Sequence, residues 1–143
     1  MKCLTAKRPP AKRRAARVKK SEVAGALENT VHAAIAAFLD TVLIPPTIYT
    51  TVPGGDGRMT TVPGYKSGFP DIIVLPSRSL LIRGVPVIGL EVKRSSGGVV
   101  SEKQIKMHEA LHLNGTRVFV VRSIDDVRLA LAECLLPTRE RIW

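Results

Sequence analysis

The chain has 143 residues, enough for one domain with a buried core. It carries 22 lysines and arginines against 12 aspartates and glutamates, and its apolar runs are all shorter than a membrane span, which excludes a membrane-spanning class. No signal peptide is visible, and the two cysteines, Cys3 and Cys134, lie near opposite ends of the chain. A disulfide framework is therefore not expected, and a reducing intracellular compartment is the default.

The excess of positive charge lies in the first 20 residues, which hold nine lysines and arginines and no acid. The remaining residues are close to neutral, with 13 basic side chains against 12 acidic ones. We expect residues 1–20 to be a disordered basic arm that binds nucleic-acid phosphates, and residues 21–143 to be the folded domain. An address signal or a solubilising tail is the alternative for the arm. The expected phosphate contacts in the arm are Lys7, Arg8, Lys12, Arg13 and Arg14.

Residues 21–40 are predicted to form the first helix, with Ser21 as its N-cap. Apolar residues repeat along this segment at helical spacing and form one stripe, namely Val23, Leu27, Val31, Ile35 and Phe38. Glu28 and His32 lie one turn apart at the edge of the stripe. They form either a solvated pair or an arrangement in which Glu28 leans over the edge of the core toward a catalytic site.

The middle of the chain contains a strand and a long loop region. The β-branched run 47–52 predicts a strand, and Gly-rich punctuation follows at 53–57. Residues 58–62 either return as a hairpin partner or belong to the loop. Lys66, in the stretch that leads to Asp71, either contacts phosphate or is simply exposed.

Two apolar runs carry charged residues at one end and are predicted to be buried strands. Asp71 opens the run 71–75, and Glu91 and Lys93 follow the run 85–90. Because side chains alternate along a strand, Glu91 and Lys93 point to the same face. If the strands are neighbours, the two acids and the lysine form a site suited to Mg²⁺ and phosphoryl chemistry. A buried ion pair of the lysine with either acid is the alternative.

A helix is predicted over residues 101–114, where Ser101 and Gln104 have the spacing of a capping box. Gln104, His108 and Leu111 share one helix face, and Leu111 should face the core. Gln104 is therefore also expected to point inward, where it can bind a water or a phosphate. His108 and His112 lie one turn apart, but no third ligand stands near them to complete a zinc site. Both histidines are expected to be packed or solvated.

The remaining elements define the fold class. Arg94 opens a Gly/Ser-rich loop that is either a phosphate contact or a mobile connection, and a short extra strand is expected at 80–82. A last strand over 116–121 and a helix capped by Ser123 complete the chain. This order predicts an α/β fold with a central mixed sheet of about four strands and helices on both faces. The last strand should run parallel to the strand that holds Glu91.

The order of these motifs resembles that of the VRR-NUC family, a branch of the PD-(D/E)xK nuclease superfamily. The matching runs are KSGFPD at 66–71, EVK at 91–93, GVVSEKQ at 98–104 and VFVVRSIDDV at 118–127. The resemblance covers about residues 21–136. It implies a restriction-endonuclease-like core of αβββαβ type, in a chain similar to the small stand-alone members from phages and bacteria.

The resemblance also implies roles for individual residues. Asp71 and Glu91 would bind Mg²⁺ or Mn²⁺, aided by the carbonyl of Val92. Lys93 would position or polarise the attacking water. Gln104 would support the nucleophile or the scissile phosphate.

The family's acid on the first helix would correspond to Glu28. Small members of the family are linked with cutting branched DNA as homodimers, and larger members carry this unit in repair nucleases. We therefore predict a DNA endonuclease that depends on a divalent metal and acts as a homodimer, with DNA as its partner and no membrane or small-molecule cofactor. A non-catalytic DNA-binding protein with a structural ion pair is the alternative. An RNA-binding role is disfavoured by the near-neutral domain and the scarcity of aromatic residues.

Overall fold

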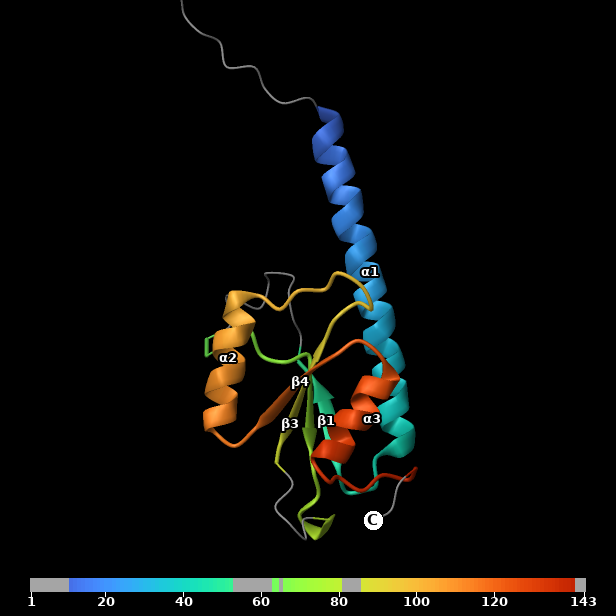
Figure 1. Ribbon diagram of the computed structural model, residues 1–143, viewed down its shortest axis with the longest axis vertical. Coiled ribbons are helices and arrows are strands. Elements are labelled where there is room, and N and C mark those ends of the chain that lie inside the picture. The colour runs from blue at the N-terminus through green and yellow to red at the C-terminus, as the bar shows by residue number, and fades with distance from the viewer. Residues whose placement is uncertain (1–10, 53–62, 65, 81–85, 141–143) are drawn as a thin grey trace, which may run out of the picture.

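The computed structural model describes residues 11–52, 63–64, 66–80 and 86–140, with the backbone alone for residues 11–26 and 80. These residues form helices and strands (Figure 1). In chain order they are α1 (Ala11–Val42), β1 (Ile48–Thr51), β2 (Ile72–Leu75), a 3-10 turn (Arg78–Leu80), β3 (Ile88–Val92), α2 (Glu102–Leu113), β4 (Arg117–Val121) and α3 (Ile124–Glu133).

The strands form one mixed sheet in the order β1-β2-β3-β4. β2 is antiparallel to both β1 and β3, whereas β3 and β4 are parallel and are connected through α2. α1 and α3 lie on one side of the sheet and α2 lies on the other (Figure 1). The predicted α/β class is confirmed, including the four-stranded mixed sheet, the helices on both faces and the parallel last strand.

The apolar core lies between the sheet and the pair formed by α1 and α3. Alternation along β2 and β3 points every second side chain toward these helices. The buried residues of this cluster are Ile35, Phe38, Leu39, Val42, Leu43, Ile72, Val74, Ile88, Leu90, Val92, Val121, Val127, Ala130, Leu131, Cys134 and Leu136. At about 25 cal/mol for each Å² of buried apolar surface, this face supplies most of the stabilisation of the fold. It therefore fixes the strands from which the polar residues of the other face project.

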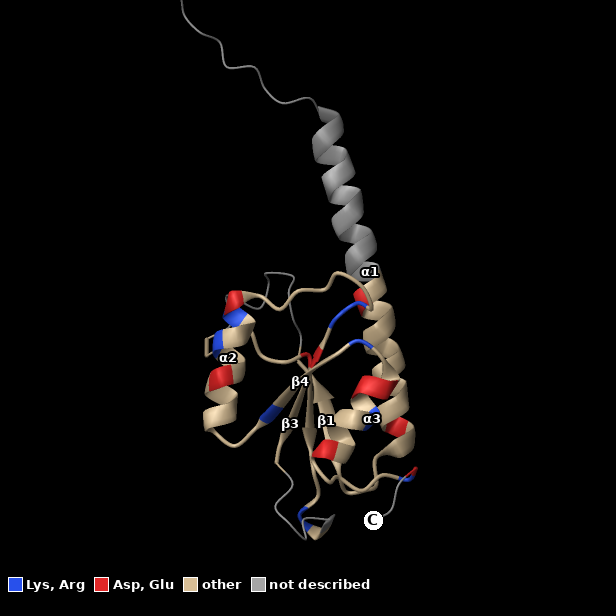
Figure 2. Ribbon diagram, in the orientation of Figure 1, with Lys and Arg blue, Asp and Glu red and all other residues tan. Residues whose placement is uncertain are grey.

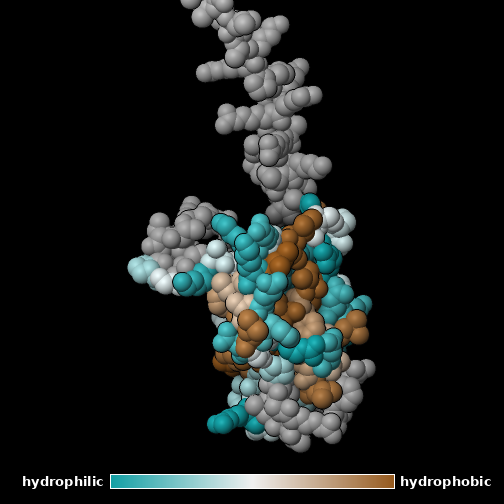
Figure 3. All heavy atoms as spheres, turned by 60° about the vertical axis from the view of Figure 1, so that its left-hand side comes forward, coloured by the Kyte–Doolittle hydropathy of each residue, from teal (hydrophilic) through white to brown (hydrophobic). Residues whose placement is uncertain are grey.

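The face toward α2 is more open and more polar. No residue of α2 is fully buried, and the cross-strand partners Ile48 and Leu75 are 59% and 40% exposed. A mixed group of acidic and basic residues gathers at one end of the sheet, beside α1 (Figure 2). The side of the molecule seen in Figure 3 carries an apolar band among hydrophilic residues.

The first helix begins ten residues earlier than predicted. α1 starts at Ala11 rather than at Ser21, so its first ten residues belong to the segment that the sequence assigned to the basic arm. Alanine, lysine and arginine are strong helix formers, and this segment contains no glycine or proline to stop a helix that packing has already nucleated downstream. The N-terminal half of α1 extends beyond the end of the sheet (Figure 1). Residues 1–10 lie outside the described residues.

The structure also tests the predicted helix caps and the predicted short strand. Ser101 and Ser123 cap α2 and α3 as predicted, and Ser101 forms the complete capping box with Gln104. The extra strand predicted at 80–82 is wrong at residue 80, which ends a 3-10 turn, and its other residues lie outside the described part. The hairpin alternative at 58–62 also lies outside it. None of the helices that the structure describes has the long apolar stretch that a bilayer crossing requires.

Gly68 lets the loop before β2 approach the first turn of α2. Its φ of +91° lies in the left-handed region, which favours glycine. A Cβ atom at this position would lie 2.6 Å from the carbonyl oxygen of Lys103, so no larger residue fits without moving one of the two backbones. The loop that leads to Asp71 is thereby held against α2.

We expect Gly68→Ala to destabilise the protein more than Gly115→Ala does. Gly115 also has a positive φ, of +80°, but a Cβ atom there would meet nothing within 4 Å. Both variants carry the cost of a left-handed alanine, about 1–2 kcal/mol. The contact with Lys103 should add about 1–3 kcal/mol for Gly68→Ala alone. Urea unfolding of the two variants measures the difference, and equal losses would show that the loop gives way without cost.

Candidate active site

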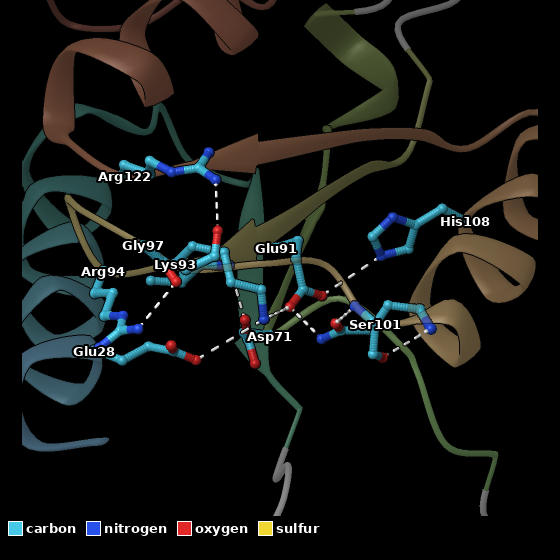
Figure 4. A network of polar contacts seen from close by, with 12 residues as sticks. Glu28, Asp71, Glu91, Lys93, Arg94, Gly97, Ser101, His108 and Arg122 are labelled. Carbon is cyan, nitrogen blue, oxygen red and sulfur yellow. Dashed lines mark hydrogen bonds and ion pairs between the residues drawn. The ribbon is translucent and has the colours of Figure 1, made fainter. Parts of the chain in front are cut away.

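Asp71 and Glu91 meet across the β2–β3 pair. Asp71 directly precedes β2, and the antiparallel register pairs Ile72 with Leu90, which places Asp71 opposite Glu91. The amide of Val92 donates a hydrogen bond of 2.7 Å to Oδ2 of Asp71. Figure 4 shows the two carboxylates in one network of polar contacts. The structure thus brings together the two acids that the sequence predicted to be neighbours.

Pro70 and Gly89 bring the two strands of the site close together. A Cβ atom on Gly89 would lie 2.8 Å from Cγ of Pro70, so the buried proline ring lies directly on the bare backbone of β3. Proline also restricts its own φ and the conformation of the residue before it. Pro70 thereby limits the positions that the neighbouring Asp71 can take.

Lys93 joins the site from the end of β3. Its Nζ lies 2.6 Å from Oε1 of Glu91 and 3.9 Å from Oε1 of Glu28 on α1. The Lys93 side chain is 9% exposed and that of Glu91 is fully buried, whereas Glu28 is 37% exposed. The structure therefore places Glu28 at the solvent edge of the same site. Lys93 contacts both Glu28 and the buried Glu91.

Gln104 contacts both the start of α2 and the buried acid. Its Oε1 accepts a hydrogen bond of 2.8 Å from the amide of Ser101, which is the capping-box contact. Its Nε2 donates to Oε1 of Glu91. Gln104 therefore has both roles that the sequence suggested: it caps α2 and it points inward.

His108 is a site neighbour that the sequence reasoning did not assign. It lies one turn after Gln104 on α2, and its Nε2 is 3.4 Å from Oε2 of Glu91. Of the two outcomes expected for His108, packed or solvated, the structure shows the first, since its side chain is 16% exposed and packs against the carboxylate of Glu91. The spacing of Gln104 and His108 on one helix face was the available signal.

Burial dominates the electrostatics of Glu91. Its pKa is raised from 4.5 to about 7, first by desolvation and then by the charges of Asp71 and Glu28, while Lys93 acts in the opposite direction. Burial also lowers the pKa of His108, and the charge of Lys93 lowers it further. Lys93 therefore does not fully offset the cost of burying this charge, and a bound cation would stabilise the charged form of Glu91.

The donor atoms of the site suit a hard cation. In the part of the chain that the structure describes, no three side chains of the His, Cys, Asp and Glu types are grouped to hold a metal ion by themselves. The set implied by the resemblance is instead two carboxylates, from Asp71 and Glu91, and the backbone carbonyl of Val92. Oxygen donors of this kind fit Mg²⁺ or Mn²⁺, and Oε2 of Glu91 is buried and has no hydrogen-bond partner among the described residues.

The predicted nucleic-acid contacts lie in different environments. Lys66 is exposed in the loop before β2. Arg94 is partly buried and donates a hydrogen bond of 2.9 Å to the carbonyl of Gly97, within the loop that follows Lys93. Lys12, Arg13 and Arg14 lie in the first turn of α1, where the backbone alone is described, and Lys7 and Arg8 lie outside the described residues.

Arg122 ties the loop after Lys93 to the end of β4. Its guanidinium donates a hydrogen bond of 2.8 Å to the carbonyl of Gly98. A Cβ atom on Gly98 would lie 2.9 Å from Cβ of Lys93, so the loop passes close to the lysine. The loop is thus held at the margin of the site by contacts from both Arg94 and Arg122.

Comparison with known proteins identifies the fold. No family model matches the sequence, and no curated protein matches it either. Among solved structures, a VRR_NUC domain protein matches with a TM-score of 0.58 at 18% sequence identity, and the match covers 76% of this chain and 87% of that one. The chain therefore has the VRR-NUC fold, as the order of its motifs predicted.

Proposed function

We propose that this chain is a DNA endonuclease that uses a divalent metal ion, Mg²⁺ or Mn²⁺, to hydrolyse phosphodiester bonds. The observation that carries the proposal is the convergence of Asp71, Glu91 and Lys93 from neighbouring strands. Gln104 from α2 joins them on the same carboxylate. These residues lie in one network of polar contacts (Figure 4), in a chain with the VRR-NUC fold.

Each residue of the site has a role in this proposal. Asp71 and Glu91, with the carbonyl of Val92, would hold the ion. A bound Mg²⁺ supplies Lewis acidity at the phosphate and makes a coordinated water more acidic. Lys93 orients the attacking water and offsets negative charge that develops on the phosphate. Water forms the new bond to phosphorus and the bond from phosphorus to the leaving oxygen breaks.

The remaining polar groups support this arrangement. Gln104 keeps Glu91 in place through its amide and is near enough to the acid to contact the nucleophile or the phosphate as well. Glu28 lies within 4 Å of Lys93 and places a second negative charge beside the lysine on the solvent side. Lys66 and Arg94 belong to loops beside the site and are the proposed contacts to neighbouring phosphates.

The basic segment and the site share one helix. Lys20 lies eight residues before Glu28 in α1, and Lys12 lies 16 residues before it. At 1.5 Å for each residue, these positions lie about 12 Å and about 24 Å from Glu28 along the helix axis. We propose that this part of α1 binds the phosphates of a duplex whose cleavage point lies at the site. Lys7, Arg8, Lys12, Arg13 and Arg14 would extend that contact.

We also propose that the substrate includes branched DNA and that two copies of the chain act together. Two copies would place two sites on one junction, so that paired strands are cut. The partly exposed pair Ile48 and Leu75 at the edge of the sheet offers an apolar surface that a second copy could cover. Sedimentation as a monomer, both alone and with four-way DNA, would contradict this part of the proposal.

A non-catalytic DNA-binding protein is the second candidate function. It is favoured by the short contact of 2.6 Å between Lys93 and Glu91, which pairs two opposite charges without a cation. In that case the acidic site would be a structural ion pair, and the basic segment of α1 would bind the DNA. The two candidates differ in whether the wild-type protein cuts DNA at all.

The wild-type protein should cleave DNA in Mg²⁺ or Mn²⁺ and not in chelator, whereas Asp71→Asn should be at least about 100-fold slower. The asparagine keeps an oxygen that can accept from the Val92 amide, so the fold and DNA binding should persist. Linear, flapped and four-way DNA, resolved on gels, would measure rate and preference. Asp125→Asn is the matched control, because Asp125 is an exposed acid of α3. Cleavage by Asp71→Asn at the wild-type rate would mean a contaminating nuclease, and no cleavage by any protein would favour the non-catalytic candidate.

The stability of the ion-free protein should fall as the pH rises from about 4.5 to above 7. The pKa of Glu91 is raised in the folded state, so the folded protein holds this proton more tightly, and that stabilisation is lost above a pH of about 7. Relative to Glu91→Gln, the wild type should lose on the order of 3 kcal/mol over this range. Urea unfolding in chelator measures the difference, with Glu102→Gln on the exposed side of α2 as a control. Parallel curves for wild type and Glu91→Gln would show that Glu91 is not perturbed.

A helix break within α1 should weaken DNA binding without removing any charge. Val18→Pro deletes a backbone hydrogen bond in the helix interior and kinks the segment that carries the basic residues. We expect about tenfold weaker binding, the loss of about two phosphate contacts, and a smaller salt dependence. Fluorescence anisotropy on the Asp71→Asn background measures this, with Val18→Ala as the control. Equal affinities for the two variants would mean that the arm does not act as a rigid helix.

A further inference from the structure

The two oxygens of Glu91 are held very unequally. Oε1 forms an ion pair of 2.6 Å with Nζ of Lys93 and also accepts a hydrogen bond from the side-chain amide of Gln104. Oε2 has no hydrogen-bond partner among the described residues, although the Glu91 side chain is fully buried. A buried carboxylate oxygen without a partner costs about 1–3 kcal/mol or more, so buried oxygens of this kind nearly always have one.

The group that faces this oxygen is the imidazole of His108. Nε2 of His108 lies 3.4 Å from Oε2 of Glu91, and it too is buried without a hydrogen-bond partner in the described part of the chain. Gln104 and His108 are one turn apart, so α2 presents one donor to each oxygen of the same carboxylate (Figure 4). Two unpaired buried atoms that face each other in this way are complementary when the imidazole carries its proton on Nε2.

We propose that His108 is a positioning residue, whose Nε2–H donates to Oε2 of Glu91 and fixes the rotation of that carboxylate for metal binding. The inference rests on the proposed function, since it concerns the metal site of the same reaction. With Lys93 and Gln104 on one oxygen and His108 on the other, the carboxyl plane of Glu91 has one orientation relative to Asp71. Groups that orient a metal-binding carboxylate in this way commonly contribute about 10–100-fold to metal affinity.

His108 also closes the site toward the surface. It borders a hollow between α2 and β4 that Leu113 and Val118 also line. A smaller side chain at position 108 would open that hollow toward Glu91 and admit water. Water would satisfy Oε2 without fixing its direction, so the loss of His108 should act on metal affinity more than on folding.

The test compares His108→Ala, His108→Gln and His112→Ala with the wild type. Glutamine retains an N–H donor that reaches Oε2, whereas alanine has none. His112 lies one turn further along α2 and lines the same hollow, but it is exposed. Calorimetric titration of each folded protein with Mg²⁺ and with Mn²⁺, without DNA, gives the dissociation constants directly. Circular dichroism confirms that each variant is folded before titration.

We expect His108→Ala to bind both ions about tenfold or more weakly, while His108→Gln and His112→Ala stay close to the wild type. Cleavage by His108→Ala should recover at saturating metal, which places the defect in metal binding rather than in the chemical step. Unchanged dissociation constants for His108→Ala would overturn the proposal. A loss confined to Mn²⁺ would also overturn it, because it would make His108 a direct ligand.

The outcomes separate this inference from the proposed function. A wild type that binds metal but cuts no DNA would end the nuclease proposal, and His108→Ala would still report on the positioning of Glu91. A wild type that cuts DNA, together with His108→Ala that binds metal normally, would end the His108 proposal alone. A wild type that binds neither ion would overturn both.

Discussion

The buried carboxylate of Glu91 is the constraint on which the rest of the site depends. It lies on β3, which has a neighbouring strand on each side, and its side chain is fully buried. A charge in such a place is costly unless other groups compensate it. Lys93 supplies the opposite charge, and Gln104 supplies a hydrogen bond. The neighbouring elements are therefore arranged around one carboxyl group, and its raised pKa measures how incomplete the compensation is without a cation.

The two faces of the sheet divide the tasks of stability and chemistry. Val92 points its side chain into the apolar core, while its amide holds Asp71. Glu91 and Lys93, on either side of it, point to the other face by the alternation of the strand. A well-packed core on one face makes these backbone positions rigid, and a loosely covered second face leaves room for a phosphate. The absence of fully buried residues in α2, which covers the second face, is consistent with this division.

The sequence predicted those features that depend on short-range periodicity. The alternation of Glu91 and Lys93, the cap at Ser101 and the strand that follows Asp71 all follow from neighbours within a few residues. The start of α1 was placed too late, because Ser21 is a good N-cap and outweighed the helix formers that precede it. The contact of His108 was missed because the helix face that it shares with Gln104 indicates only its direction. Which side chain of the sheet it meets depends on where α2 crosses β3. Gln104 was assigned correctly on both counts, since a cap and a shared helix face are local.

The site also couples elements that are far apart in the sequence. The side-chain amide of Gln104 accepts a hydrogen bond from the N-terminus of α2 through its oxygen and donates one to Glu91 through its nitrogen. A shift of the helix would therefore move the acid as well. Gly68 brings the loop that precedes Asp71 against the same turn of α2. On the other side, Glu28 connects Lys93 to α1, the helix that carries the basic segment. A phosphate backbone bound along α1 would thus be held in a fixed relation to the carboxylates, because a single helix carries both the basic segment and a neighbour of the lysine.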